Sequence, residues 1–240
     1  MERSRDFVAV GRAIVEARFP ECDAALLAGS MVRGEGTETS DLDIVVITGD
    51  KEAPYRESFV WEGWPVEAFV HSEKSLLDYF EQDAKRYQLS LQQMCAEGIV
   101  LRDHDGVGER AKAEARRQLE AGPKPLTEEE MERLRYTVTD LLDDFQGSVR
   151  EEETYLIAHD LAEASVRLIL LGNGRWPGGG KWVVRALRGY DPAMAEELTA
   201  ALRSFYRDGE KGGLSAFAED ALAAFGGRLF DGFRSPRKAK

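Results

Sequence analysis

Asp41 and Asp43 stand one residue apart at the start of an apolar run, Ile44–Ile47. On a β-strand, side chains two residues apart point to the same face, so we expect these carboxylates to converge. Two converging carboxylates repel each other unless a cation neutralises them, and Mg²⁺ prefers carboxylate, water and phosphate oxygens. The pair therefore predicts a magnesium site.

A third acid and a glycine-containing loop belong to the same expectation. Glu67 is the single charge in the apolar segment Val66–Val70, and we favour a third metal ligand over the alternative of a solvated strand face. Gly29 and Ser30 follow the short apolar run Ala24–Ala28. Glycine lets the backbone approach a phosphate closely, and a serine hydroxyl and backbone N–H groups can bind its oxygens.

The order of these residues resembles a known signature. Gly29-Ser30 is followed about ten residues later by Asp41-x-Asp43, as in the DNA polymerase β-like nucleotidyltransferase superfamily. Arg33 and Ser40 extend the resemblance to the small bacterial group of aminoglycoside nucleotidyltransferases and minimal nucleotidyltransferases. The similarity covers roughly residues 24–71.

The resemblance implies a metal-dependent phosphoryl transfer. Two Mg²⁺ ions would be held by Asp41, Asp43 and Glu67, and Ser30 would bind the terminal phosphates of a nucleoside triphosphate, for which we expect ATP. Arg33 is either a phosphate ligand or a brace of its loop, and both interpretations stay open. NMP, expected to be AMP, would pass to a hydroxyl of a small cationic acceptor such as an aminoglycoside-like molecule, with release of pyrophosphate.

Other functions remain open at this point. The acceptor could be a protein or tRNA, as for the minimal nucleotidyltransferases of toxin–antitoxin pairs, or the chain could be a non-catalytic nucleotide-binding module. The resemblance also leaves a homodimer open.

The patterns around these residues predict an α+β fold. A mixed sheet with flanking helices, of the polymerase β-like nucleotidyltransferase type, should occupy residues 1–110, and an all-helical bundle residues 111–240. The expected strands are Ala24–Ala28, Leu42–Thr48, Glu57–Trp61, Pro65–His71 and an edge strand Ile99–Arg102. The expected helices are Phe7–Phe19, Ser75–Tyr87, Val107–Ala121, Glu128–Phe145, Val149–Leu171, Lys181–Leu187, Pro192–Tyr206 and Gly213–Phe225. Thr127 and Glu130 predict a capping box before the fourth of them.

The helical half offers candidates for a general base and for further phosphate contacts. Asp160 and Glu163 lie three residues apart, on one helix face, and either could accept the acceptor's proton. Arg167 could contact phosphate, although Glu163 and Arg167 also match an ordinary surface ion pair at a spacing of four. Lys181 lies in the glycine-rich segment Gly172–Trp182 and is either a candidate triphosphate ligand or part of a plain helix connection.

The overall composition bears on partners and location. The net charge is −12, from 32 basic and 44 acidic residues, which argues against broad nucleic-acid binding and favours a cationic acceptor. No apolar run approaches the roughly 20 residues of a membrane helix, and the N-terminus lacks the apolar core of a secretory signal. With only Cys22 and Cys95, both expected to be buried thiols, we expect a cytoplasmic protein without a membrane partner.

Overall fold

The computed structural model describes residues 6–49 and 53–234. The chain forms two compact units, Met1–Ala121 and Gly122–Lys240. The helix Val107–Ala121 (α5) packs within the first unit, where its apolar side chains join the core beneath the sheet. The sequence-based division between residues 110 and 111 thus falls inside this helix, whereas the compact units divide where it ends.

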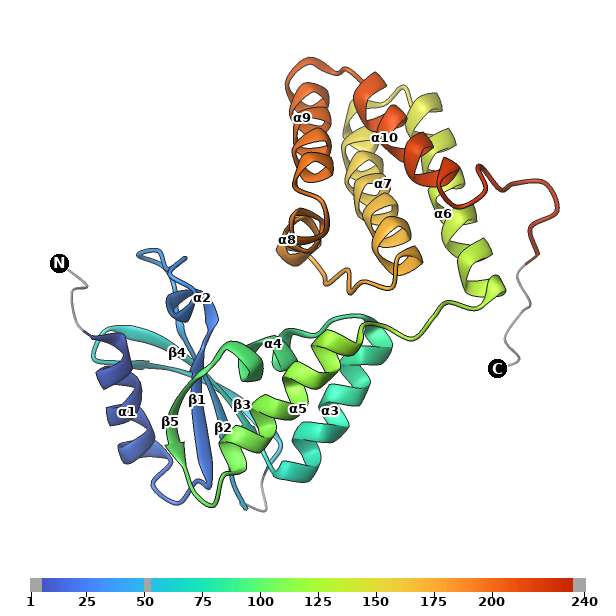
Figure 1. Ribbon diagram of the computed structural model, residues 1–240. Helices are drawn as coiled ribbons and strands as arrows, with labels where there is room; N and C mark the ends of the chain where they lie inside the picture. The colour runs from blue at the N-terminus through green and yellow to red at the C-terminus, as the bar shows by residue number, and fades with distance from the viewer. Residues whose placement is uncertain (1–5, 50–52, 235–240) are drawn as a thin grey trace. The chain divides into compact units, whose positions relative to one another are not determined.

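The first unit is built on a five-stranded mixed sheet, as the sequence predicts (Figure 1). The strands run in the order β3-β4-β2-β1-β5. β2 and β4 are parallel, and the other neighbouring pairs are antiparallel. Their bounds are β1 Ala24–Ala28, β2 Leu42–Ile47, β3 Tyr55–Trp61, β4 Trp64–His71 and β5 Ile99–Asp103. The predicted edge position of β5 is confirmed.

Helices cover both faces of this sheet. The first helix, α1 (Phe7–Arg18), packs on the face formed by alternate residues such as Leu27, Ile44 and Val66. On the opposite face, which carries Leu26 and Val45, lie α3 (Glu73–Arg86), α4 (Ser90–Glu97) and α5, as Figure 1 shows. This alternation is the period of two that a strand imposes on its side chains.

Two helices of the first unit are not among the elements expected from the sequence. The first, α2 (Gly29–Val32), is a single turn directly after β1. In α4 the polar Gln92 interrupts the apolar pattern, yet its side chain is fully buried. Its Nε2 donates to the carbonyl of Phe80 at 2.8 Å, whereas its Oε1 is buried without a partner among the described residues, so this tertiary contact offsets part of the cost of burying the amide.

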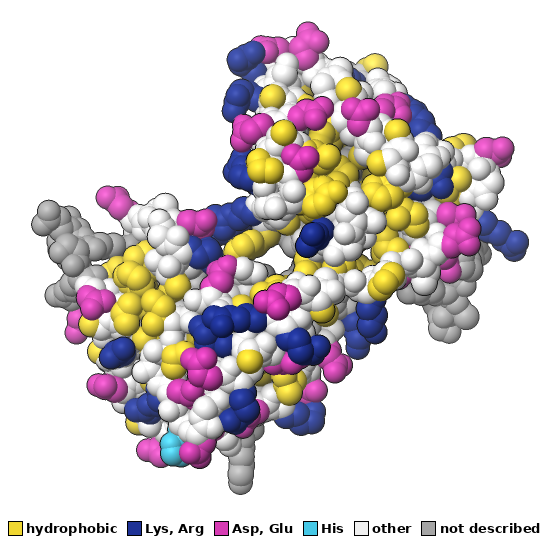
Figure 2. Space-filling model, in the orientation of Figure 1, with side chains coloured by type: hydrophobic (Ala, Val, Ile, Leu, Met, Phe, Trp, Pro, Cys, Tyr) yellow, Lys and Arg dark blue, Asp and Glu magenta, His cyan; other side chains and the backbone are white. Residues whose placement is uncertain are grey.

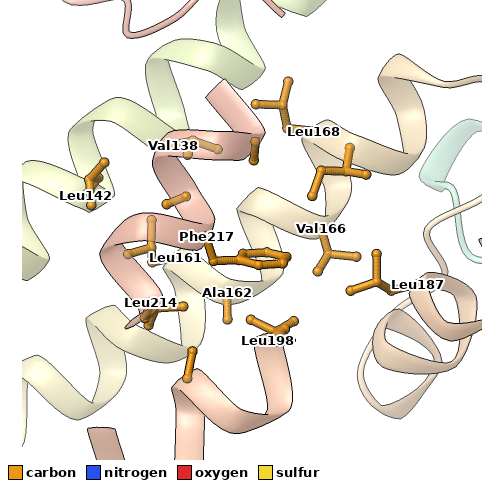
Figure 3. Close-up of a cluster of buried hydrophobic side chains, with 14 of the residues drawn as sticks. Val138, Leu142, Leu161, Ala162, Val166, Leu168, Leu187, Leu198, Leu214 and Phe217 are labelled. Atoms are coloured by element: carbon orange, nitrogen blue, oxygen red, sulfur yellow. The ribbon is translucent and has the colours of Figure 1, made fainter. Parts of the chain in front are cut away.

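The second unit contains helices and no strand between residues 122 and 234, as predicted. Its helices are α6 Glu128–Gly147, α7 Glu151–Gly172, α8 Lys181–Tyr190, α9 Pro192–Asp208 and α10 Gly212–Ala223. Their apolar faces meet in one cluster, in which Leu161, Phe217 and Leu198 approach from three helices (Figure 3). The predicted capping box is present, since the Glu130 N–H donates to Thr127 Oγ1 at 3.2 Å and the Thr127 N–H donates to Glu130 Oε2 at 2.8 Å.

The surface and the cysteines agree with the composition. On the face that Figure 2 shows, Lys and Arg side chains lie interspersed with Asp and Glu. Both cysteines are buried and free, as expected. Among residues 6–49 and 53–234, no helix has the length and apolarity that crossing a membrane requires.

Candidate active site

The register of the sheet brings the three acids together. β2 and β4 run parallel with Asp43 opposite Glu67, and Asp41 directly precedes β2. Each of the three carboxylates offers an oxygen, and these oxygens all lie within 4.8 Å of one another. All three residues are half-buried. The structure therefore places at one point the acids that the sequence spread over 27 positions.

The electrostatics of this cluster favour a cation. The pKa of Asp43 is raised from 3.8 to about 6, first because the carboxyl is buried and then because Asp41 and Glu67 lie nearby. The positive charges of Arg33 and Arg56 act in the opposite direction. Three hard oxygen donors held together against their mutual repulsion match the ligand preference of a divalent ion such as Mg²⁺. The residues present thus fit the metal that the resemblance implies.

Gly29 leaves space for the Asp43 carboxylate. Its φ is +83°, and a Cβ built there would lie only 2.0 Å from Asp43 Oδ2. A side chain at this position would meet both a disfavoured backbone conformation and a collision with a proposed metal ligand. Gly29 is predicted from the sequence to let the backbone approach a phosphate, and the structure adds this steric role.

Ser30 lies at the first turn of α2, in the segment joining β1 to β2. Its hydroxyl donates to Ser40 Oγ at 3.1 Å, and Ser40 Oγ accepts from the Thr37 N–H at 2.8 Å. These bonds link the two ends of the segment next to Asp41. In this arrangement the Ser30 proton is directed at Ser40, so binding a phosphate oxygen would require the hydroxyl to rotate.

Arg33 makes the contacts expected of a brace. Its Nε donates to Glu35 Oε2 at 3.1 Å, and one terminal nitrogen lies 3.4 Å from Glu97 Oε2 at the end of α4. The side chain is only 16% exposed, so the guanidinium is held between these acids. Its charge also lowers the pKa of Asp43. Of the two interpretations that the sequence left open, these contacts favour bracing.

Arg56 was not singled out by the sequence. It lies on β3, donates to Glu67 Oε2, and places its guanidinium carbon 4.9 Å from the centre of the Phe69 ring. The β3–β4 hairpin could have indicated its position, because Glu62 and Gly63 form a two-residue turn with positive φ. Counting back from that turn sets Arg56 opposite Phe69 and Ser58 opposite Glu67.

The candidates from the helical half belong to the second unit. Asp160, Glu163 and Arg167 lie on α7, and Lys181 is the first residue of α8. Asp160 and Lys181 are exposed, whereas Glu163 is half-buried with its Oε2 3.9 Å from His159 Nε2. Their roles as base or phosphate ligand stay predictions.

Comparisons with known proteins address the first unit most directly. Residues 11–96 match the model of the nucleotidyltransferase domain family, a range that contains the acid cluster and the Gly29-Ser30 loop. Among solved structures, the chain is similar to a nucleotidyltransferase-like protein from Exiguobacterium sibiricum 255-15. The two share 17% identity over 91% of this chain and 73% of that one, with a TM-score of 0.43. No curated protein matches the chain.

The matched region and the site coincide. The segment from α1 to α4 carries the strands, the loop and the three acids that the signature requires. Residues 11–96 of this chain therefore match the nucleotidyltransferase domain family of the DNA polymerase β-like superfamily, and the residues of the site lie within the matched range.

Proposed function

We propose that the chain is a magnesium-dependent nucleotidyltransferase that moves NMP, and specifically AMP from ATP, to a hydroxyl of a small cationic acceptor. The observation that carries the proposal is the cluster of Asp41, Asp43 and Glu67, whose carboxylate oxygens lie within 4.8 Å of one another. A fold retained only for binding would have no use for three acids that burial and repulsion make costly.

The proposed reaction exchanges one bond at phosphorus for another. The acceptor oxygen attacks the α-phosphorus of the triphosphate, an oxygen–phosphorus bond forms, and the bond to the bridging oxygen breaks as pyrophosphate leaves. Bound magnesium would lower the pKa of the attacking hydroxyl and neutralise charge on the phosphates. Asp41, Asp43 and Glu67 would hold two magnesium ions.

The remaining residues would position the substrates. Gly29 leaves the Asp43 carboxylate free to face the substrate, and Arg33 holds the loop through Glu35 and Glu97. Ser30 would contribute a hydroxyl to the phosphates. Asp160 or Glu163 would accept the proton of the acceptor hydroxyl, a role that the variants Asp160→Asn and Glu163→Gln would test. Arg167 and Lys181 would contact phosphate.

The choice of a small cationic acceptor rests on charge. The net charge of −12 attracts cations and repels nucleic acids at long range, and the basic side chains visible in Figure 2 lie among acidic ones. A cytoplasmic location is part of the same proposal, and the two buried free cysteines agree with it.

The test is pyrophosphate release with Mg²⁺, each of the four nucleoside triphosphates and a panel of hydroxyl-rich cationic acceptors. Asp41→Asn and Asp43→Asn, shown to be folded by circular dichroism, are the controls. We expect turnover with ATP and at least one acceptor, and loss of at least about 100-fold in both variants. Metal-dependent binding of ATP without turnover would move the proposal to a macromolecular acceptor. No binding of any nucleotide would refute an enzymatic role.

A further inference from the structure

Arg56 occupies a position beside the acid cluster that the proposed chemistry does not explain. It projects from β3, the edge strand next to β4, to the sheet face that carries Asp43 and Glu67. Its guanidinium pairs with Glu67 Oε2 and lies over the Phe69 ring, 4.9 Å from the ring centre. One oxygen of a proposed metal ligand is therefore already engaged by a cation of the chain itself.

The influence of Arg56 extends beyond this pair. The hydrogen bond with Glu67 raises the pKa of Arg56, and the charges of Glu67, Asp43 and Asp41 raise it further. Conversely, Arg56 lowers the pKa of Asp43. The guanidinium thus neutralises part of the negative charge that would attract a metal ion.

We propose that Arg56 is an internal counter-cation of the acid cluster, which competes with a divalent ion for Glu67 and thereby weakens binding of free metal in the absence of nucleotide. The inference rests on the metal-dependent function proposed above. A bound triphosphate adds negative charge that offsets the repulsion between Arg56 and the metal, so metal and nucleotide would bind together more favourably than either alone.

A role for Arg56 in orienting Glu67 would have the opposite consequence. If the guanidinium held Glu67 in the geometry that ligation needs, removing it would weaken metal binding, as loss of an outer-shell partner usually does. Exposure favours competition over orientation, because the Arg56 side chain is 57% exposed and can move away, whereas that of Glu67 is 25% exposed. The sign of the change in metal affinity separates the two roles.

The expected change in metal affinity follows from the charge of Arg56. Coulomb's law for charges of +1 and +2 roughly 6 Å apart in water gives an energy equivalent to about a tenfold change in dissociation constant, and salt reduces it. We therefore expect Arg56→Gln to bind Mn²⁺ about three- to tenfold more tightly than the unmodified chain, without nucleotide and at low salt. Arg56→Lys keeps the charge and should change the affinity less than twofold.

A matched control is Arg18, at the end of α1, which contacts the other face of β3. Arg18 pairs with Glu57 at 3.1 Å and lies 4.5 Å from the centre of the Phe59 ring, so its contacts repeat those of Arg56 without the acid cluster. Arg18→Gln loses a similar half-exposed ion pair and should leave Mn²⁺ affinity unchanged. Any effect of lost surface packing alone would appear in both variants.

The experiment is calorimetric titration of the full chain and its variants with MnCl₂ alone, after removal of metal with EDTA and dialysis. We expect Arg56→Gln to bind Mn²⁺ more tightly than the unmodified chain, and the double variant Arg56→Gln/Asp43→Asn to lose this gain in affinity. Equal or weaker binding in Arg56→Gln, or no measurable Mn²⁺ binding in any protein, would overturn the proposal. Because the readout uses neither nucleotide nor acceptor, failure of nucleotide transfer alone would leave this result standing.

Discussion

Replacing Asp43 by Asn should make the metal-free protein more stable at neutral pH, although it removes a proposed metal ligand. Burial, followed by the charges of Asp41 and Glu67, raises the pKa of this carboxyl from 3.8 to about 6. An acid whose pKa is higher in the folded than in the unfolded state binds its proton more tightly when folded. The folded protein therefore loses stability as the pH rises from about 4 to about 6, and the full penalty is present above that range.

The size of this penalty can be worked from the shift. The difference between 3.8 and about 6 is about two pKa units, equivalent to about 3 kcal/mol at 1.36 kcal/mol per unit. The carboxyl is only half-buried, so solvent screening should reduce the value to about 1–2 kcal/mol. Asn has nearly the same shape and no charge, so the variant should gain this amount at pH 8.

The assay is urea unfolding in EDTA, followed by circular dichroism, at pH 8 and pH 4. Asp43→Asn should be stabilised at pH 8, and the gain should shrink several-fold at pH 4, where Asp43 is protonated in the folded protein. Glu114→Gln is the control, because a hydrogen bond from Arg117 lowers the pKa of Glu114 and neutralising it should give no gain. A gain of equal size at both pH values, or none at pH 8, would refute the electrostatic account.

Three further predictions concern a backbone position, the thiols and a helix cap. Gly29→Ala should destabilise the protein by about 1–2 kcal/mol for its φ of +83° alone, and the Cβ at 2.0 Å from Asp43 Oδ2 should also lower Mn²⁺ affinity, measured by the same titration. An unchanged Mn²⁺ affinity in Gly29→Ala would contradict this prediction and show that the loop adjusts to the added methyl group. Burial raises the pKa of Cys22 and raises that of Cys95 to about 12, so a thiol reagent at pH 8 should label both only after denaturation. Fast labelling of the native protein would contradict the described packing. Thr127→Ala should cost about 1 kcal/mol in urea unfolding, while Thr127→Ser should cost much less because it keeps the capping hydroxyl.

Much of the architecture follows from local patterns in the sequence. The composition and length of the run Leu42–Ile47 define a strand. Thr127 and Glu130 mark the start of a helix, because their capping hydrogen bonds join residues only three positions apart. The spacing of Asp41 and Asp43 placed both carboxylates on one face, since the period of a strand is two. These features depend on neighbours along the chain, so the sequence alone determined them.

Other features of the site were decided by contacts between distant segments. The pairing of Arg56 with Glu67 and of Arg33 with Glu97 depends on which strands and helices lie together, and so does the collision that keeps position 29 a glycine. The helix α4 was not predicted, because the polar Gln92 interrupts its apolar pattern. The Phe80 carbonyl that accepts from this buried side chain lies 12 residues away in the sequence. The sequence records which groups are present, but strand register and helix packing decide which of them meet, because charges and hydrogen bonds act over only a few ångströms.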